Sequence, residues 1–305
     1  MPAAVITGGA GFIGSALTEA LLERGYAVRV YDDLSSGSDA NLAGMAHELV
    51  RGDVRDLARL TAAAAGADVL FHLAAGAGVV QSIEDPLGNF DVNARGTVTA
   101  LEAARRAGVG RFVFSSSNAP LGAAAQPASE RLPIAPLSPY GASKAVGEAY
   151  CSAFHGAYGM DAVAVRFSNA YGPRSAHKGN VIPLFIRSIR DRRELVVYGD
   201  GSQTRDFVFV TDLAAGLVLA AEAAGVGGRV FQLASGVETS LNRLVELLGA
   251  VCGGAPPVRR EPARQGEIER NYSLIDRARD ELGYVPEVML ADGLARTWEW
   301  FAERG

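Results

Sequence analysis

Tyr140 and Lys144 are spaced so that they could act together in acid–base chemistry. They lie in "LSPYGASKAVGE", where Ser138 is a typical N-cap and Pro139 a typical first helical residue. The two side chains therefore fall one turn apart on one helix face. An ammonium beside a phenol lowers the pKa of the tyrosine and makes it a usable general base near neutral pH. Because such a pair is also common on plain helix surfaces, its surroundings decide its interpretation.

Three hydroxyls stand where a strand is expected to end. The apolar run "RFVF" predicts a buried strand over Arg111–Ser115, which leads into "SSSNAPLG" at residues 115–122. A loop could explain these polar residues, and so could an active site. The strand ends of a doubly wound parallel sheet open on one edge, where ligands bind. On that reading the strand end places Ser117 beside Tyr140.

A glycine-rich loop lies near the N-terminus. Gly8, Gly11 and Gly14 follow an apolar run and precede a predicted helix with one apolar face. Glycine there allows a tight turn and a close approach of the backbone to a pyrophosphate, whose charge the helix N-terminus favours. Such loops also occur as plain turns, so the residues that follow matter.

Asp32 strengthens the dinucleotide interpretation. It ends the second predicted strand, 18 residues after Gly14, where a carboxylate can accept hydrogen bonds from an adenosine ribose. A carboxylate repels a 2′-phosphate, so NAD is favoured over NADP. Asp53, in "RGDVRD", could meet the adenine edge, although a loop carboxylate with no ligand is an alternative.

Alternating elements must position these residues. The predicted strands are Ala3–Thr7, Ala27–Tyr31, His47–Arg51, Asp68–His72, Arg111–Ser115 and Asp161–Arg166, and the clearest helices are Phe12–Arg24, Phe90–Ala107 and Tyr140–Tyr158. This order predicts an α/β fold, a Rossmann-like doubly wound parallel sheet. Beyond residue 170 Gly and Pro become frequent. We therefore expect an NAD-binding domain over 1–170 and a smaller, interleaved substrate lobe over 171–305.

Composition excludes several partners. The 305 residues are 49% hydrophobic and 21% charged, with a formal charge of −5, which does not support binding to nucleic acid or to an anionic membrane. The N-terminus lacks the features of a signal peptide or a membrane span. Cys151 and Cys252 lie far apart, so no disulfide framework is expected and a cytoplasmic location is the simplest setting. The four histidines are scattered, so no metal site is predicted.

The ordered motifs resemble a known family from residue 3 to the end of the chain. They are "TGGAGFIG", "YDDLSSG", "GDVRD", "HLAA", "SIEDP", "VNARGT", "FSSS", "YGASK", "RFSNAYGPR", "NVIP", "VYGDGSQTRDFVFV" and "RQGEIE". The set resembles the extended short-chain dehydrogenase/reductases, and within them the NAD-dependent nucleotide-sugar epimerases typified by UDP-glucose 4-epimerase. The resemblance also implies a homodimer formed by the helices Phe90–Ala107 and Tyr140–Tyr158.

The resemblance implies roles for many residues. Those implied for NAD are Gly8, Gly11, Phe12, Ile13 and Gly14 at the pyrophosphate, Asp32, Asp33, Ser35, Ser36 and Gly37 at the ribose, Asp53 and Val54 at the adenine, and Leu73, Ala74, Ala75, Ser115, Tyr140, Lys144 and Phe167 along the remainder of the cofactor. Those implied for a UDP-hexose are Ser117, Tyr140, Asn169, Asn180, Val181, Tyr198, Arg205, Arg264 and Glu267. Two arginines suit a diphosphate, because a guanidinium pairs bidentately with phosphate oxygens.

The family's chemistry implies a mechanism and its alternatives. Tyr140 would act as base, with Lys144 and Ser117 as catalytic partners, while carbon 4 of the sugar is oxidised and then reduced on its other face. Relatives that eliminate water carry an acid and a base at the two positions after Ser117, but Asn118 and Ala119 stand here and cannot trade protons near neutral pH. A keto-sugar reductase or other nucleotide-sugar dehydrogenase remains an alternative, and so does a non-catalytic NAD-binding regulator.

Three other residues have less specific interpretations. His72, which ends a predicted core strand, is interpreted as a structural histidine. His177 and Lys178, in "SAHKGN", could contact substrate phosphate or lie in a solvated loop. Pro120 and Leu121 depart from the usual Val-Tyr of the epimerases, so the shape of the sugar pocket stays open.

Overall fold

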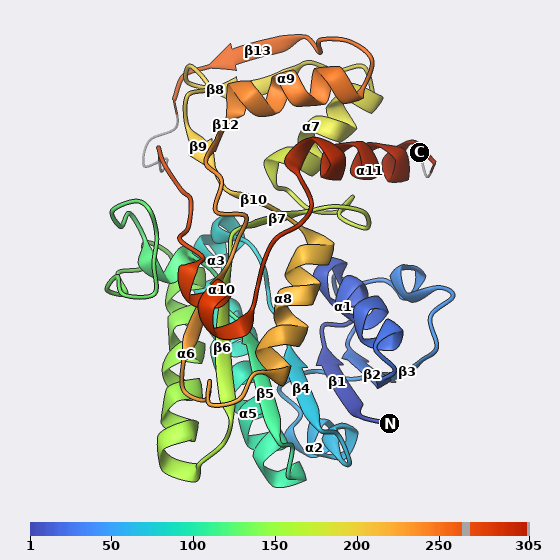
Figure 1. The fold of residues 1–305 in the computed structure, drawn as a ribbon, viewed down its shortest axis with the longest axis vertical. Helices are drawn as coiled ribbons and strands as arrows, with labels where there is room; N and C mark the ends of the chain where they lie inside the picture. The colour runs from blue at the N-terminus through green and yellow to red at the C-terminus, as the bar shows by residue number, and fades with distance from the viewer. Residues whose placement is uncertain (264–268, 304–305) are drawn as a thin grey trace.

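A parallel sheet forms the centre of the computed structural model, which describes residues 1–263 and 269–303. Its seven strands run in the order β11-β6-β5-β4-β1-β2-β3, and every neighbouring pair is parallel (Figure 1). The strands are β1 (Ala3–Thr7), β2 (Ala27–Asp32), β3 (His47–Arg51), β4 (Val69–His72), β5 (Arg111–Ser115), β6 (Ala162–Phe167) and β11 (Val230–Leu233). The predicted Rossmann-like fold class is confirmed.

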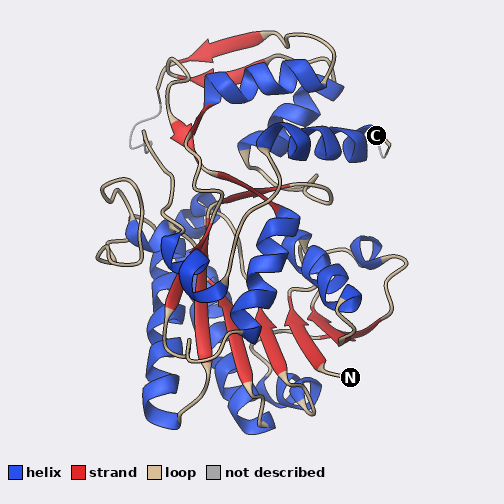
Figure 2. Cartoon of the chain, viewed as in Figure 1, coloured by secondary structure: helices blue, strands red, loops and turns tan. Residues whose placement is uncertain are grey.

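Helices cover both faces of the sheet (Figure 2). On one face, α1 (Phe12–Glu23), α8 (Val210–Glu222) and α10 (Asp276–Leu282) pack on alternate strand residues such as Ile6 and Val30. The opposite face carries α2 (Leu57–Ala64), α5 (Gly96–Ala107) and α6 (Pro139–Tyr158), with Phe112 in their shared core. Successive strand side chains point to opposite faces, so a sheet covered on both sides needs nearly continuous apolar strands.

The helix predicted over Phe90–Ala107 is present, but its first residues are π-helical rather than α-helical. Residues Phe90–Arg95 form a π-helical segment, η2, which leads into α5. Asn93 in this segment accepts from the Gly76 backbone N–H at 2.7 Å and donates to the Gly76 carbonyl at 3.1 Å. A wide turn that carries a buried polar side chain has no sequence period to reveal it.

Short segments link the sheet to these helices. They are the 3₁₀ turns η1 (Asp39–Leu42) and η3 (Ala119–Leu121), and the short helices α3 (Val79–Glu84) and α4 (Pro86–Asn89). The last two lie beside α6.

The C-terminal lobe has its own small core, above the sheet in Figure 1. Its elements are α7 (Val181–Arg190), α9 (Leu241–Val251), α11 (Leu290–Ala302) and the parallel pair β8 (Leu195–Tyr198) and β13 (Val258–Glu261). The short pair β7 (Asn169–Tyr171) with β10 (Phe207–Phe209) lies between lobe and sheet, and the short pair β9 (Thr204–Arg205) with β12 (Thr239–Ser240) lies in the lobe beside α9. Because β11 returns to the sheet from this part of the chain, the division at residue 170 stays a prediction.

Candidate active site

The strand order reverses between β1 and β4. From β1 the chain builds β2 and β3 on one side, and β4 then pairs with β1 on the other. The loops after these two strands touch: Gly8 has a φ of +72°, and a Cβ there would stand 2.6 Å from the Ala74 nitrogen. In open α/β sheets, ligands bind at such a switch point.

The glycine loop fits a pyrophosphate. A Cβ on Gly14 would lie 2.2 Å from the Gly8 carbonyl oxygen, so the loop closes tightly on the start of α1. The helix begins at Phe12 after Gly11, and no side chain caps its first N–H groups. Uncapped N–H groups at a helix N-terminus attract an anion. The predicted pyrophosphate residues are thus brought together in a shape that suits the group.

Asp32 organises the loop that is predicted to hold the ribose. One carboxylate oxygen accepts from the Ala10 N–H and the other from the Leu34 N–H, each at 2.9 Å. Burial raises the pKa of Asp32 above its ordinary value. Gly37 packs so closely on Ala10 that a Cβ would come within 2.8 Å of its carbonyl carbon. The carboxylate therefore shapes the loop, and its oxygens retain further lone pairs that can accept hydrogen bonds from a ligand.

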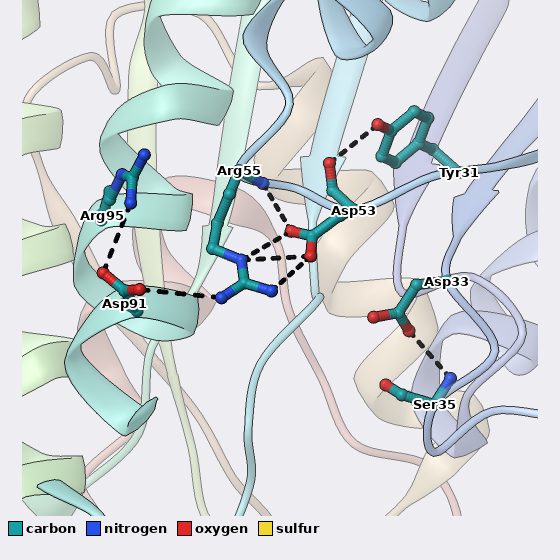
Figure 3. Close-up of polar contacts among 7 residues, drawn as sticks. All are labelled: Tyr31, Asp33, Ser35, Asp53, Arg55, Asp91 and Arg95. Atoms are coloured by element: carbon teal, nitrogen blue, oxygen red, sulfur yellow. Dashed lines mark hydrogen bonds and ion pairs between the residues drawn. The ribbon is translucent and has the colours of Figure 1, made fainter. Parts of the chain in front are cut away.

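An ion-pair chain that sequence reasoning missed surrounds Asp53 (Figure 3). The Arg55 guanidinium donates to both carboxylate oxygens of Asp53, at 2.9 and 2.5 Å, and holds the pKa of that carboxyl below its usual range. Arg55 also lies 3.7 Å from Asp91, which in turn pairs with Arg95. Tyr31 donates to the Asp53 carbonyl at 2.8 Å. The alternating charges of "RGDVRD" were the available signal.

The remaining predicted cofactor residues lie in the same part of the fold. In Figure 3, Asp33 accepts from the Ser35 N–H at 2.8 Å in the loop after β2. Val54 is buried, while Phe167 ends β6, beside the end of β5. These positions agree with the implied roles, which stay predictions.

Ser117, Tyr140 and Lys144 come together where β5 ends against α6. Ser138 caps the helix as expected, its hydroxyl accepting from the Gly141 N–H at 3.1 Å. The Lys144 ammonium donates to the Ser115 carbonyl at 2.7 Å and lies 5.9 Å from the centre of the Tyr140 ring. Strand end and helix face thus converge as the sequence predicts.

The expected lowering of the Tyr140 pKa is wrong for the protein's own groups. Burial raises the pKa of Tyr140, and the hydrogen bond from Ser117 opposes this only in part. Burial also lowers the pKa of Lys144 to about 7, against the attraction of Glu148. The sequence argument omitted desolvation, which disfavours both charged forms at once.

His72 has the structural role that the sequence indicated. Its ring lies within 2.7 Å of the Thr7 hydroxyl and 3.1 Å of the Thr97 hydroxyl, and it is completely buried. Burial lowers its pKa to about 3, so the ring is neutral at physiological pH. The structural interpretation is confirmed.

The predicted substrate residues lie on several segments at the base of the C-terminal lobe. Asn169 begins β7 and donates to the Asp206 carbonyl at 3.2 Å, next to Arg205 in β9. Asn180 is the N-cap of α7, and Val181 is its first residue. Arg264 and Glu267 lie outside the described residues.

A cavity of about 1160 Å³ opens in the C-terminal lobe, and Tyr198 is one of its lining residues. Its lining includes none of Ser117, Tyr140 and Lys144. The cavity therefore lies apart from the three predicted catalytic residues.

Asp206 is a buried carboxylate that accepts several hydrogen bonds, and sequence reasoning did not single it out. Its carboxylate accepts from the Ser235 hydroxyl at 2.7 Å, from the Gly236 N–H at 3.0 Å and from the Ser273 N–H at 3.3 Å. The Ser273 hydroxyl also accepts from the Asn118 amide at 2.9 Å. These contacts connect the catalytic strand end to the lobe that carries Arg205.

The described residues were also compared with what a membrane-spanning helix and a metal site require. None of the helices there has the length and apolarity needed to cross a membrane. The same ranges contain no group of three or more His, Cys, Asp or Glu side chains arranged to hold a metal ion.

Comparisons with known proteins agree with this geometry. The sequence model of the NAD dependent epimerase/dehydratase family matches residues 4–234. The chain is 39% identical to a UDP-glucose 4-epimerase of Mycolicibacterium smegmatis, with 98% of each chain covered, and 37% identical to a dTDP-glucose 4,6-dehydratase of Streptomyces niveus, covering 98% of this chain and 92% of that one. A UDP-N-acetylglucosamine 4-epimerase from Methanobrevibacter ruminantium M1, solved with UDP-N-acetylmuramic acid, superposes with a TM-score of 0.95 at 34% identity, covering 100% and 99%.

Proposed function

Because the chain belongs to the NAD dependent epimerase/dehydratase family, we propose that it inverts carbon 4 of a UDP-sugar through a transient 4-keto sugar. The observation that carries the proposal is the convergence of Ser117, Tyr140 and Lys144 beside two residues that cannot exchange protons, Asn118 and Ala119. A sugar C–H is not acidic, so inversion of a carbinol carbon needs temporary oxidation.

The chain's residues divide the work of that oxidation. NAD bound by the glycine loop and Asp32 would supply a reversible acceptor for the hydride of the sugar carbon. Tyr140 takes the proton of the sugar hydroxyl, and Ser117 hydrogen-bonds the same oxygen. Lys144 stabilises the phenolate by its positive charge, together with the charge of the oxidised nicotinamide. This assistance has to overcome the desolvation that raises the pKa of Tyr140.

Asn118 favours epimerisation over loss of water. Elimination requires an acid and a base beside the ketone, and an amide or a methyl group can be neither. The Asn118 amide instead donates to Ser273 at 2.9 Å and to Ser168 at 3.4 Å. The similarity to a dehydratase does not supply the missing groups, and a keto-sugar reductase would use the same catalytic residues with net consumption of cofactor.

We propose the following binding roles on the geometry above. Gly8, Gly11 and Gly14 hold the NAD pyrophosphate, Asp32 holds the ribose, and the other implied residues line the path to Lys144. The UDP portion lies against α7, Tyr198 and Arg205, so that residues 1–170 mainly bind cofactor and residues 171–305 mainly bind substrate.

A homodimer is proposed from an apolar surface beside α6. Large apolar side chains are exposed on α3, α4 and the start of η2: Val79, Val80, Ile83, Leu87 and Phe90. Leu87 is 80% exposed. Apolar patches of this kind mark interaction surfaces. Sedimentation should show a dimer at micromolar concentration and a monomer for Leu87→Glu, whereas a wild-type monomer would contradict the proposal.

The two cysteines support a reducing location. Cys151 and Cys252 are both free thiols, and Cys151 is buried. Disulfides are rare where thiols are kept reduced. We propose a cytoplasmic enzyme, which cell fractionation would test.

The deciding experiment offers the protein several UDP-sugars. UDP-glucose, UDP-N-acetylglucosamine and UDP-glucuronate are each incubated with a trace of NAD, and the sugars are then analysed by chromatography and mass spectrometry. Inversion without accumulation of NADH supports the proposal. In parallel incubations with excess NAD or NADH, consumption of one cofactor per sugar identifies a dehydrogenase or a reductase. Loss of water identifies a dehydratase, and no turnover at all would sink the proposed function.

A further inference from the structure

Three consecutive serines meet three consecutive turns of α6. Ser117 hydrogen-bonds Tyr140, and the Ser115 carbonyl accepts from Lys144 at 2.7 Å. One turn further along the helix, Glu148 accepts from the Ser116 hydroxyl at 2.5 Å. Positions four apart lie on one helix face, so the three pairs form a continuous seam between strand end and helix.

Glu148 is also half of a buried ion pair. Its two carboxylate oxygens accept from Arg166 Nε at 2.8 Å and Nη2 at 2.7 Å, and both side chains are only 3% exposed. Arg166 lies on β6, the neighbour of β5. The Ser116 N–H also donates to the Val165 carbonyl at 2.7 Å, which keeps the strand end in register. Glu148 therefore joins three elements at the point where the catalytic residues meet.

We propose that Glu148 is a positioning residue that fixes the Ser115–Ser117 strand end on α6 and supplies a countercharge that favours the ammonium form of Lys144. The inference rests on the proposed function, because it assigns Lys144 a charge that the reaction uses.

The surroundings of Lys144 leave Glu148 as its source of negative charge. On its own helix Lys144 has Tyr140 one turn before it and Glu148 one turn after it, and Lys144 and Glu148 are both buried. The strand β4 contributes the neutral ring of His72, and β5 contributes the Ser115 carbonyl and the Phe114 ring. Arg166, from β6, is engaged by Glu148. Without the carboxylate, burial would leave Lys144 largely neutral at physiological pH.

The charge of Lys144 can be measured without any sugar. The chain contains two lysines, Lys144 and Lys178, so protein made with ε-¹³C lysine gives two side-chain signals, which Lys178→Arg assigns. The signals are followed against pH in the full chain, with and without NAD. In Glu148→Gln we expect the Lys144 midpoint to fall by about one pH unit, a tenfold change in its protonation equilibrium. A midpoint equal to the wild-type value would overturn the proposal that Glu148 supplies a countercharge to Lys144.

Turnover separates the two parts of the role. In Glu148→Gln, kcat should fall about tenfold at pH 7.5 with KM little changed. Glu148→Asp keeps the negative charge and should restore most of the lost kcat. Ser116→Ala keeps the ion pair and is the matched control: its kcat should fall a few-fold while the Lys144 midpoint stays in place. An unchanged kcat in Ser116→Ala would overturn the proposal that Glu148 fixes the strand end through Ser116.

A folding defect would not obscure the result. Arg166 is left unpaired in Glu148→Gln, so the double variant Glu148→Gln/Arg166→Met removes both charges, which is often neutral for stability. It should melt near the wild-type temperature and still show the lowered Lys144 midpoint. A wild type that turns over no nucleotide sugar would refute the proposed function, whereas the lysine titration would still report on Glu148.

Discussion

The two lysines of the chain lie one in each half of the site, and their surroundings differ. Lys144 donates to the Ser115 carbonyl, and the buried carboxylate of Glu148 lies one turn further along the same helix. Lys178, in the loop before α7, has a pKa lowered by burial and forms no ion pair within the described ranges. Lys144 thus has a hydrogen-bond acceptor and a carboxylate on the same helix face, whereas Lys178 has no ion-pair partner among the described residues.

This difference teaches how the two halves divide their tasks. Preorganised groups accelerate a reaction because they need not rearrange when charge develops. A binding region gains affinity when an incoming anion supplies the missing countercharge. The predictions below test whether the two halves can be separated in this way.

The largest effect should come from Tyr140→Phe. Removal of the base hydroxyl should lower kcat about 1000-fold or more while NAD still binds, since the ring that packs in the site remains. Tyr158→Phe, at the exposed end of the same helix, is the control and should keep full activity. Calorimetry with NAD and a turnover assay measure the two quantities; a fully active Tyr140→Phe would remove the tyrosine from the chemistry.

Arg205→Lys should affect binding rather than chemistry. A lysine cannot grip a phosphate bidentately, so KM for the nucleotide sugar should rise about tenfold with kcat nearly unchanged. Arg279→Lys, at an exposed position of α10, serves as the control. If kcat fell and KM did not, the proposed division between the halves would be wrong.

Lys178→Gln should raise stability while it weakens substrate binding. The folded pKa of Lys178 lies below its ordinary value of 10.5, so between those values the unfolded chain binds more protons and stability rises with pH. The loss of stability caused by burying the Lys178 charge is therefore largest below the folded pKa and disappears above about pH 10.5. At pH 7 the variant should melt about 1–3 °C higher, and the gain should vanish in strong base.

Lys178→Arg is the matched control, because it retains a charge throughout this pH range. Equal melting temperatures for Lys178→Gln and the wild type at neutral pH would show that the charge of Lys178 already has a partner.

The smallest effect is expected for Arg55→Ala. Arg55 and Asp53 are both more than one-third exposed, and solvent screens such pairs. NAD affinity should change less than about threefold, because an exposed ion pair contributes little. A large loss of affinity in titration calorimetry would mean that Arg55 orders the adenine end.

Local patterns were enough to predict much of the sheet half. The residues of β1, β3 and β5 were predicted exactly as they occur, and the start of α6 followed from Ser138 and Pro139. Apolar runs and capping residues act over a few neighbouring residues, so they can be recognised in the sequence alone. The short strands of the C-terminal lobe carry no comparable period.

The remainder was decided by contacts between distant segments. Ser116, Glu148 and Arg166 meet only because β5, β6 and α6 pack together, and Asp206 finds Ser273 only across the lobe. The sequence by itself determined which groups could do chemistry and the order in which the sheet would present them. Only the tertiary structure decided their charge states, because desolvation and countercharges arise when separated residues are buried side by side.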